Sequence, residues 1–474
     1  MSLGKSVTVL LTRIDDVMYF PLLVIIMAIV GLYFTVRTRA VQIRLIPNAL
    51  KLLVEPPEKD AKVSSLQAMF LSTASRVGTG NIVGVSTAIC MGGPGACFWM
   101  WVMCIIGASS SFVESTLAQI YKIETPEGML YGGPAYYIER ALHAPWLAVL
   151  FCVFQIATFG VGSTLLCSYN LQSTFTIYDF YDLTTTPFII GCILAIITGY
   201  CFLGGGKRIV GVTTFLVPFM GIQYVLVSLI VILFNIKNVP LMFTMIFKDA
   251  FNFRAIMGGI SGSCLVYGIK RGLFSNEGGI GSAPNASASA KVSHPAKQGL
   301  VQTLSVYIDT LILCTATAFM CLVTEVHHGQ DVSGAPYVQN AVSTVFGKVG
   351  PLFITAAMIL FAFTTLLGNL FYVDVALIYL NGRKVPSRRF MNAIHVLCAI
   401  VVFFGAIIPM NAAWAATDIS MGGMALINLP VCILLGRIAI DTLKDYEKQL
   451  YEGRDPVFKA ENIGLDPDDL STWK

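Results

Sequence analysis

The sequence predicts an all-α polytopic membrane protein, and three observations support this prediction. Of the 474 residues, 55% are hydrophobic and only 12% are charged, whereas a soluble domain carries about 25% charged residues. The mean hydropathy is +0.73. Eleven apolar runs are each long enough to cross a membrane as a helix, which takes about 20 residues. Together these properties exclude a soluble enzyme and a disordered chain.

The eleven expected transmembrane helices divide the chain into one peripheral helix and two halves. They lie at residues 18–36, 64–91, 95–121, 145–172, 187–204, 208–235, 252–275, 298–324, 350–380, 388–409 and 411–437. Removing the first span leaves two sets of five, and a repeat with an odd number of spans must be inverted in the membrane. The expected domains are a peripheral N-terminal helix with its cytoplasmic connection at 1–63, a first inverted repeat at 64–237, a second inverted repeat at 238–437, and a cytoplasmic tail at 438–474.

Basic residues predict the orientation of the chain in the cell (inner) membrane. Twenty-two Lys and Arg residues flank one set of span ends, and six flank the other set. Because the side richer in Lys and Arg faces the cytoplasm, the C-terminus is expected inside the cell and the N-terminus outside. The net charge of +4 is too small for the electrostatic footprint of nucleic-acid binding.

Two spans are interrupted by glycines at matching positions of the two halves. The span at 64–91 is interrupted at 78–81, and the span at 252–275 is interrupted around 258–263. Such interruptions at corresponding positions are the best sequence indication of a transporter's central site, although glycines also permit close helix packing. In the second interruption, the residues expected at the substrate site are Gly259, Ser261 and Gly262.

The depth of the second interruption predicts where the following residues lie. Ten residues from Asn252 rise about 15 Å, which is half of a hydrocarbon core about 30 Å thick. Lys270 and Arg271 are then expected at the cytoplasmic surface. The run at 274–279 is expected to be a cytoplasmic element that acts as a gate.

The first interruption has the chemistry of a site for a carboxylate and a cation. Unwound backbone inside a membrane is tolerated only where it lines a cavity, and the N-terminus of a half-helix favours an anion. The amides of Thr79 and Gly80 are placed for a substrate carboxylate. The carbonyls of Ala74 and Val77 and the amide oxygen of Asn81 are placed for cations, because such oxygens can replace a hydration shell.

Charged side chains inside the spans are expensive and therefore functional by default. Arg76 is expected to form an inward gate with Glu114 or Glu277, or alternatively to extend into a water-filled vestibule. Glu114 and Asp309 are expected to anchor helix contacts rather than to bind protons. Gating roles are thus expected for Arg76, Arg271 and Glu277.

Adjacent hydroxyl groups at Thr364 and Thr365 lie deep in the apolar run at 350–380. A threonine hydroxyl inside a helix often bonds to a carbonyl of its own helix. Alternatively, the two hydroxyls form a cation site opposite the interrupted span at 64–91.

No pattern of enzyme chemistry is present in the sequence. All twelve cysteines lie inside apolar runs and none forms a Cys-x-x-Cys pair, so neither a disulfide framework nor a metal centre is expected. Ser86 and Ser282 have no histidine partner in any motif, which leaves nucleophilic catalysis without support. The protein is therefore not expected to be an enzyme.

Several runs are similar to the signatures of one transporter family. They are SRVGTGNIVGV at 75–85, GGPGA at 92–96, GGPAYY at 132–137, RGLFSNEGGIGSAP at 271–284, FAFTT at 361–365 and NLP at 428–430. On these runs the chain resembles the alanine or glycine:cation symporter family. The resemblance extends from about residue 64 to about residue 430.

The resemblance implies a symporter that imports a small amino acid by alternating access, driven by the sodium gradient, with a leucine-transporter-like fold. Its implied partners are the amino acid, Na⁺ as the coupling ion and the lipid bilayer, with no other cofactor. The implied substrate-site residues are Thr79, Gly80, Asn81, Gly162, Thr365 and Asn369. The implied sodium ligands are the carbonyls of Ala74 and Val77 and the hydroxyls of Thr364 and Thr365.

The chain departs from the family pattern in the substrate pocket. The fourth span of the family carries a Gly-Asn-x-x-Gln-x-Asn pattern, in which Leu166 here replaces the glutamine and Ser168 an asparagine. Asn369 stands where many members have tryptophan, and Asp374 stands where they have glutamate. Because a polar and a bulky aromatic side chain are lost, the resemblance does not determine which amino acid is selected.

A proton-coupled amino-acid permease is the alternative function. It would need an acidic side chain beside one of the two interruptions to carry the proton, and the sequence places none there. An ion channel and a membrane-embedded enzyme are further rivals. The channel needs no cradle for a carboxylate, and the enzyme needs a nucleophile–base pair or a metal.

Overall fold

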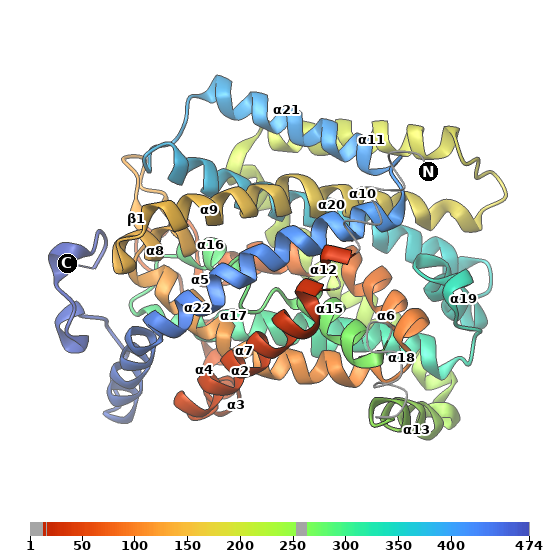
Figure 1. Ribbon diagram of the computed structural model, residues 1–474, viewed down its shortest axis with the longest axis horizontal. Helices are drawn as coiled ribbons and strands as arrows, with labels where there is room; N and C mark the ends of the chain where they lie inside the picture. The colour runs from red at the N-terminus through yellow and green to blue at the C-terminus, as the bar shows by residue number, and fades with distance from the viewer. Residues whose placement is uncertain (1–12, 16, 253–262, 474) are drawn as a thin grey trace.

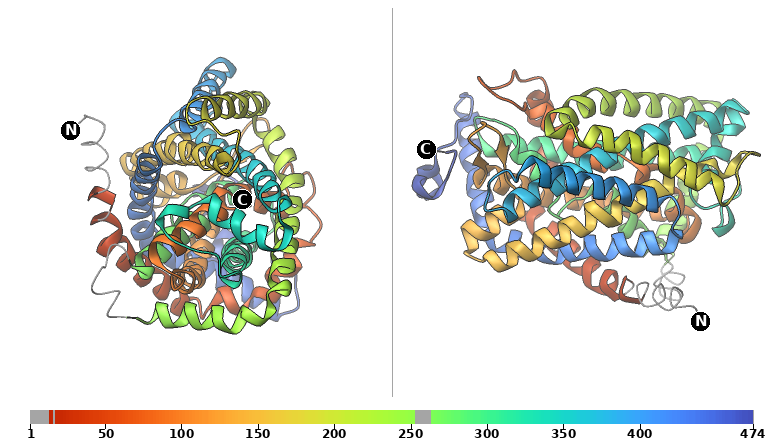
Figure 2. Two further views of the ribbon diagram at one scale, coloured as in Figure 1. Left: turned by 90° about the vertical axis from the view of Figure 1, so that its right-hand side faces the viewer. Right: turned by 90° about the horizontal axis from the view of Figure 1, so that it is seen from above.

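The computed structural model describes residues 13–15, 17–252 and 263–473. These residues form a bundle of long helices that run side by side along the longest axis of the molecule (Figure 1), and two further views show the same packing (Figure 2). The described part also contains a two-stranded antiparallel sheet, in which Ile123 pairs with Tyr131 and Glu124 with Leu130. The predicted all-α class is therefore confirmed, apart from this short hairpin.

Eight helices in the described residues are long and apolar enough to cross a membrane. They are Ala96–Ile120, Pro145–Ile177, Thr185–Phe202, Arg208–Phe234, Pro295–Val323, Val349–Leu380, Arg388–Gly405 and Ala413–Tyr451. Three expected spans are not among these eight. The helices at 18–36 and 64–91 are shorter or interrupted, and most of the first half of the span at 252–275 lies outside the described residues. The count of eleven and the two inverted repeats remain predictions.

In the first half of the described chain, one span is interrupted between α5 and η2, and another contains the π-helical segment η3. In chain order, where η marks π- and 3₁₀-helices, the elements are η1 (Met18–Leu23), α2 (Val24–Arg37), α3 (Val41–Arg44), α4 (Ile46–Leu53), α5 (Ser65–Arg76), η2 (Gly80–Gly84), α6 (Val85–Gly92), α7 (Ala96–Ile120), β1 (Ile123–Glu124), β2 (Leu130–Tyr131), α8 (Pro134–Leu142), α9 (Pro145–Gln155), η3 (Ile156–Gly162), α10 (Ser163–Ser173), η4 (Thr174–Ile177), α11 (Thr185–Phe202), α12 (Gly205–Phe234) and η5 (Ile236–Asn238). A capping box starts α5, because the Ser64 hydroxyl accepts from the Gln67 amide and the Gln67 side chain accepts from the Ser64 amide.

The last long helix of the second half, α22, is followed by two short 3₁₀-helices. The elements of the second half are α13 (Val239–Ala250), α15 (Cys264–Asn276), α16 (Ala283–Ala288), α17 (Pro295–Tyr307), η7 (Ile308–Cys314), α18 (Thr315–Val323), η8 (Gln330–Val332), α19 (Ala335–Phe346), α20 (Val349–Leu380), α21 (Arg388–Gly405), α22 (Met410–Tyr451), η9 (Ala460–Ile463) and η10 (Pro467–Asp469). The hydroxyl of Ser263 caps α15 by accepting from the Val266 amide.

Small residues let the central helices approach one another closely. A Cβ on Gly268 of α15 would lie 2.5 Å from the Ala96 carbonyl oxygen of α7, and one on Gly299 of α17 would lie 2.8 Å from the Phe112 ring. Neither position can hold a larger side chain without separating the helices. Such small-residue contacts are typical of helices packed inside a membrane.

A break in the second half follows α15. The predicted break at 258–263 falls, apart from Ser263, on residues outside the described ones, among them Gly259, Ser261 and Gly262. The described helix α15 is continuous from Cys264 to Asn276, and the chain then turns through 277–282 before α16 begins. Gly279 and Gly281 adopt φ values of +90° and +89° in this turn, a conformation that favours glycine.

The predicted surface position of this segment is wrong. Glu277, expected on the cytoplasmic surface, is only 3% exposed, and Lys270 and Arg271 are buried as well. Helices packed around the segment cover these side chains, which a count of residues along one helix does not reveal. The segment 274–279 therefore lies inside the bundle and forms part of its central break.

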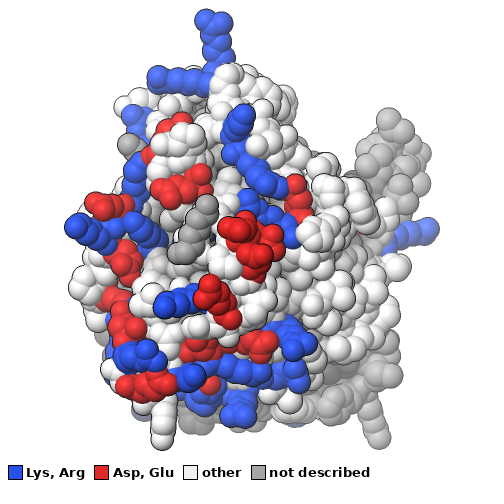
Figure 3. Space-filling view, turned by 90° about the vertical axis from the view of Figure 1, so that its left-hand side faces the viewer, with Lys and Arg blue, Asp and Glu red and all other residues white. Residues whose placement is uncertain are grey.

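Charged side chains gather at one end of the bundle. The C-terminal tail, the β1–β2 hairpin and α8 lie at one end, the tail end, and α13 and α19 lie at the opposite end (Figure 1). Lys, Arg, Asp and Glu side chains gather over the tail end (Figure 3). Between the ends, large apolar side chains of α11 and α12 such as Ile196 and Phe215 are exposed, as expected for surfaces that face lipid.

The C-terminal tail packs against the tail end of the bundle. The Trp473 indole donates to the Gln119 carbonyl at 2.8 Å, and its ring lies 4.9 Å from the Lys122 ammonium. Lys297 at the start of α17 forms an ion pair with Asp455 at 2.8 Å. These contacts tie the tail to α7 and α17.

Candidate functional site

The first interruption separates α5 from η2 and frees backbone groups between them. The Gly78 amide donates to Asn81 Oδ1 at 2.8 Å, so it does not close a helical hydrogen bond to the Ala74 carbonyl. The amides of Thr79 and Gly80 lie at the start of the second half-helix, where the first amides have no partner within their own helix. The backbone therefore presents a carbonyl from one half-helix and amides from the other.

A small cavity lies against this interruption. It is lined by Ser75, Arg76, Gly78, Thr79, Gly80, Ser163, Cys167, Phe274, Glu277, Thr365 and Met421. These residues come from both interrupted helices and from α10, α20 and α22. The cavity volume is only about 10 Å³, which is the space that one water molecule needs, so the site is closed in this conformation.

Thr365 on α20 faces the interruption directly. Its side chain is buried, and its hydroxyl has no hydrogen-bond partner among the described residues. A Cβ added to Gly78 would overlap this hydroxyl. Thr365 thus places an unpartnered hydroxyl beside Gly78 of the first break.

Thr364 behaves differently from its neighbour. Its hydroxyl lies within hydrogen-bond distance of the Leu360 and Phe361 carbonyls of its own helix, at 3.0 and 3.1 Å. It also lies 3.5 Å from the Met220 sulfur of α12. Of the two alternatives considered for the pair, own-helix bonding describes Thr364, whereas Thr365 is directed at the interruption.

Asn369 links three helices at the edge of the cavity. Its Nδ2 donates to the Ser163 hydroxyl at 3.0 Å, and its Oδ1 lies 3.2 Å from the Ser75 hydroxyl. Gly162, the neighbour of Ser163, packs against α22, where an added Cβ would lie 2.9 Å from the Thr417 Cα. The structure therefore places Gly162 at a helix contact, and Ser163 takes its place in the cavity wall.

A buried carboxylate, Asp309 of η7, lies beside the first interruption. Asn81 Nδ2 donates to Asp309 Oδ1 at 2.7 Å, and the Ser275 hydroxyl donates to Asp309 Oδ2 at 2.8 Å. Asn81 therefore uses both ends of its amide within the protein, because its oxygen is occupied by Gly78. The prediction that no acid lies beside an interruption is wrong, since Asp309 is 228 residues away in sequence but in contact in space.

Two further carboxylates hold the second interruption. Glu277 Oε1 lies 3.0 Å from the Ser75 hydroxyl of α5, so the two breaks touch one another. Glu114 of α7 accepts from the backbone amides of Gly279 and Gly281 at 3.2 and 3.0 Å. Glu114 thus anchors the unwound segment, in agreement with the expected role in helix contacts.

Arg76 is buried beside the cavity at 2% exposure, so it does not extend into a water-filled vestibule. Its guanidinium donates to the Gln302 carbonyl and the Ser111 hydroxyl, both at 3.3 Å. Within the described residues, no ion pair joins it to Glu114 or Glu277. The expected inward gate at Arg76 is therefore not an ion pair in this conformation.

Arg271 forms a buried ion pair on the other side of the cavity. Its Nη2 lies 2.7 Å from Asp418 Oδ2 of α22, and its guanidinium lies 3.7 Å from the centre of the Trp414 ring. Trp414 packs edge-on against Phe274 at 5.0 Å, and Phe274 covers Gly80. Because α15 starts near α13, this stack closes the cavity toward the end opposite the tail.

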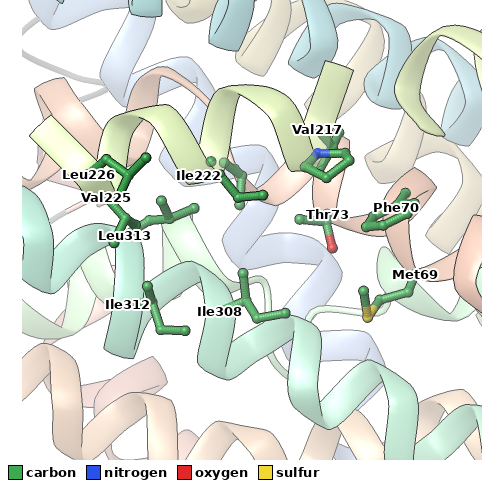
Figure 4. A pocket seen from close by; sticks show the side chains of 13 residues that line it. Met69, Phe70, Thr73, Val217, Ile222, Val225, Leu226, Ile308, Ile312 and Leu313 are labelled. Carbon is green, nitrogen blue, oxygen red and sulfur yellow. The ribbon is translucent and has the colours of Figure 1, made fainter. Parts of the chain in front are cut away.

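A much larger apolar pocket lies beside α5 but differs in chemistry from the central cavity. Its volume is about 360 Å³, and α5, α12 and η7 supply its apolar walls (Figure 4). The Thr73 hydroxyl in its wall is bonded to Ser305 at 2.8 Å. A zwitterionic ligand needs polar groups to offset its desolvation, so this pocket is not the amino-acid site.

Asn170 of α10 is a site residue that the sequence did not indicate. Its Nδ2 donates to the Thr79 hydroxyl at 3.0 Å, and its Oδ1 has no partner among the described residues. A polar side chain inside the apolar run at 145–172 was the available signal. The same is true of Asp309, which was recognised as a costly charge but not as a neighbour of the break.

Together, the fold and the site define a membrane transporter rather than an enzyme. Transporters build their substrate sites from interrupted helices that meet inside the bundle, and here two such helices meet at a closed polar cavity. The model of the sodium:alanine symporter family matches residues 4–460, and the chain belongs to this family. The resemblance to an alanine or glycine:cation symporter family is thereby confirmed.

Two named relatives align with most of the chain. The amino-acid carrier protein AlsT of Bacillus subtilis (strain 168) is 43% identical over 447 residues, 94% of this chain and 93% of AlsT. The sodium/proton-dependent alanine carrier protein of Bacillus sp. (strain PS3) is 36% identical over 434 residues, 88% of this chain and 95% of the relative.

One solved structure is similar in fold at low sequence identity. It is the crystal structure of MhsT in complex with L-phenylalanine, with a TM-score of 0.53 and 14% identity over 82% of this chain and 93% of MhsT. At this identity the likeness concerns the arrangement of helices alone. It agrees with the leucine-transporter-like fold that the sequence resemblance implied.

Proposed function

We propose that the protein imports a small neutral amino acid together with Na⁺ by alternating access. The observation that carries this proposal is the unpartnered Thr365 hydroxyl, which faces the freed backbone of the first interruption. An oxygen ligand beside an unwound backbone is the arrangement that replaces a cation's hydration shell. Membership of a sodium:alanine symporter family supports sodium as the coupling ion.

The proposed roles follow the two breaks. The carbonyls of Ala74 and Val77 with the hydroxyls of Thr364 and Thr365 form the sodium site, with Thr365 the ligand that the geometry supports best. The amides of Thr79 and Gly80 hold the substrate carboxylate. The remaining proposed substrate contacts are Asn81, Gly259, Ser261, Gly262, Thr365 and Asn369, with Ser163 in place of Gly162 and Asn170 added.

The proposed topology places the tail end in the cytoplasm. Twenty-two Lys and Arg residues flank the span ends on the side of the C-terminal tail and six flank the other side, and the positive-inside rule assigns the basic side to the cytoplasm. Arg271 then belongs to the outer gate, and Glu277 with Arg76 to the inner half of the site. The inverted repeats at 64–237 and 238–437 would rock around the shared cavity.

The cavity walls support a neutral side chain on the substrate. Away from the breaks they are Ser163, Cys167, Thr365 and Met421, with Phe274 at the end of α15, and none of these carries a charge. The closed volume of about 10 Å³ holds no amino acid, so the bundle has to open to admit one. A thermal-shift screen of the twenty amino acids in sodium and in potassium identifies the substrate, because only bound ligands stabilise the fold.

Thr365→Val is expected to weaken sodium dependence, because the valine methyl cannot coordinate a cation. We expect the half-saturating sodium concentration for uptake into proteoliposomes to rise about tenfold, as for the loss of one bond to a charged group, with a smaller change in maximal rate. Thr364→Val is the matched control and is expected to shift it less, because its hydroxyl already bonds to its own helix. An unchanged sodium half-saturation in Thr365→Val would remove Thr365 from the site.

Proton coupling is the second candidate function, and the contact between Asp309 and Asn81 favours it. A carboxylate that exchanges a proton could open or close the hydrogen bond at 2.7 Å to the first break. The relative from Bacillus sp. (strain PS3), named a sodium/proton-dependent carrier, is consistent with both ions.

Uptake driven separately by each gradient distinguishes the two candidates. We expect a sodium gradient at equal pH to drive amino-acid uptake in wild type and in Asp309→Asn, and a pH gradient without sodium to drive none. The asparagine keeps an acceptor for Asn81 but cannot carry a proton. Uptake on a pH gradient alone that disappears in Asp309→Asn would establish proton coupling instead.

A further inference from the structure

A second polar cavity lies away from the transport site, between α20 and α21 at the tail end. Its volume is about 330 Å³, and its walls include Tyr131 of the β1–β2 hairpin and Gly204 of the turn before α12. Arg208 of α12 packs over Gly204, so a guanidinium covers this part of the wall. The transport mechanism proposed above uses none of these residues.

A buried hydrogen-bonded pair forms the floor of this cavity. His395 Nε2 lies 2.9 Å from Asp374 Oδ1, and the two side chains are only 4% and 8% exposed. His395 Nδ1 has no hydrogen-bond partner among the described residues. A buried nitrogen without a partner is costly, which favours a ligand that supplies the missing hydrogen bond.

Polar side chains run from the mouth of the cavity to this floor along one face of α21. Arg388, Asn392 and His395 all line the cavity, and their spacing of four and three residues places them on the same helix face. Asp374 is the carboxylate in the wall, and it is occupied by His395. The polar part of the cavity therefore fits an anion.

Much of the rest of the wall is apolar. Phe371, Ile378 and Met391 lie in the wall, and Val385 at its edge is 47% exposed. A free inorganic anion gains nothing from these side chains, whereas a hydrocarbon chain does. The combination of hydrogen-bond donors and apolar walls in one cavity matches a lipid with an anionic headgroup.

We propose that this cavity seats an anionic phospholipid, with its phosphate held by Arg388 and Asn392 and its acyl chain against Ile378 and Met391. Basic pockets between helices at the cytoplasmic side of a membrane are suited to such headgroups. The tail end is the proposed cytoplasmic end, so the cavity opens where anionic lipids lie. The bound lipid joins α20 to α21 and satisfies the polar floor.

Thermal unfolding of the purified full-length protein tests this proposal. In nanodiscs of phosphatidylcholine with increasing phosphatidylglycerol, we expect the Tm of wild type to rise and saturate. Arg388→Ala is expected to shift the midpoint of this rise to about tenfold higher phosphatidylglycerol, as for the loss of one bond to a charged group. Native mass spectrometry should show retained phosphatidylglycerol in wild type and its loss in Arg388→Ala.

Arg389→Ala is the matched control, because Arg389 is the exposed neighbour of Arg388 but does not line the cavity. It is expected to behave like wild type. If Arg388→Ala and Arg389→Ala lost bound phosphatidylglycerol equally, the stabilisation would come from general surface charge, and the proposal would be overturned. The same stabilisation by inorganic phosphate in detergent would also overturn it, because the acyl chain would then have no part in binding.

Discussion

Gly78→Ala is expected to abolish amino-acid uptake. The added Cβ would overlap the Thr365 hydroxyl, at the point where the freed backbone and the proposed sodium ligand meet. Gly78 does not adopt a left-handed φ, so the backbone itself tolerates alanine and the effect comes from the side chain. We expect uptake into proteoliposomes to fall at least about a hundredfold, since misplacement of a site by about 1 Å has effects of that size.

Gly84→Ala is the matched control for this substitution. Gly84 lies at the end of the same half-helix, but an added Cβ would meet its nearest neighbour, the Trp414 ring, at 3.9 Å, which is an ordinary contact. Uptake close to that of wild type is expected. Equal activity of Gly78→Ala and Gly84→Ala would contradict the assignment of the cavity beside Gly78 as the transport site.

Arg271→Gln is expected to destabilise the fold strongly and to reduce uptake. It leaves the Asp418 carboxylate, which is 1% exposed, without its charged partner. Breaking a buried ion pair by removing one partner costs about 3–5 kcal/mol. The loss of stability is measured as a lower free energy of unfolding in detergent. The loss of activity is measured as a lower rate of amino-acid uptake into proteoliposomes.

The exposed pair between Arg44 and Glu447 provides the comparison, because the same chemistry lies at the surface with side chains 41% and 28% exposed. Arg44→Gln is expected to change the unfolding free energy by at most about 1 kcal/mol. In the double variant of Arg271→Gln with Asp418→Asn, part of the lost stability should return, because no buried charge remains unpaired. If Arg271→Gln and Arg44→Gln lowered stability equally, the buried pair would have no special role.

Features that depend on neighbouring residues could be predicted from the sequence. Hydropathy adds up residue by residue, so the membrane class and most spans follow from local composition. The first interruption was predicted correctly at Gly78. The glycines that mark it in the sequence lie between the end of α5 and the start of η2. The backbone groups offered by Thr79 and Gly80 follow from that position alone.

Features that depend on contacts between distant segments could not be predicted in the same way. The neighbour of Asn81 is Asp309 on η7, and the partner of Arg271 is Asp418 on α22. A sequence period describes one helix face but carries no information about which other face packs against it. The sequence therefore indicated that Asp309 was costly without indicating that it lies at the break.

The sequence by itself determined that this chain is a helical membrane transporter with an interrupted span, because hydropathy and broken glycine runs are local properties. Only the tertiary structure decided that the chain unwinds again after α15, that Arg271 is buried with Asp418, and that Thr365 rather than Thr364 faces the cavity. The physical reason is that a charge or hydroxyl inside a membrane takes its role from the group packed against it. That group is set by the packing of whole helices rather than by the residues beside it in the chain.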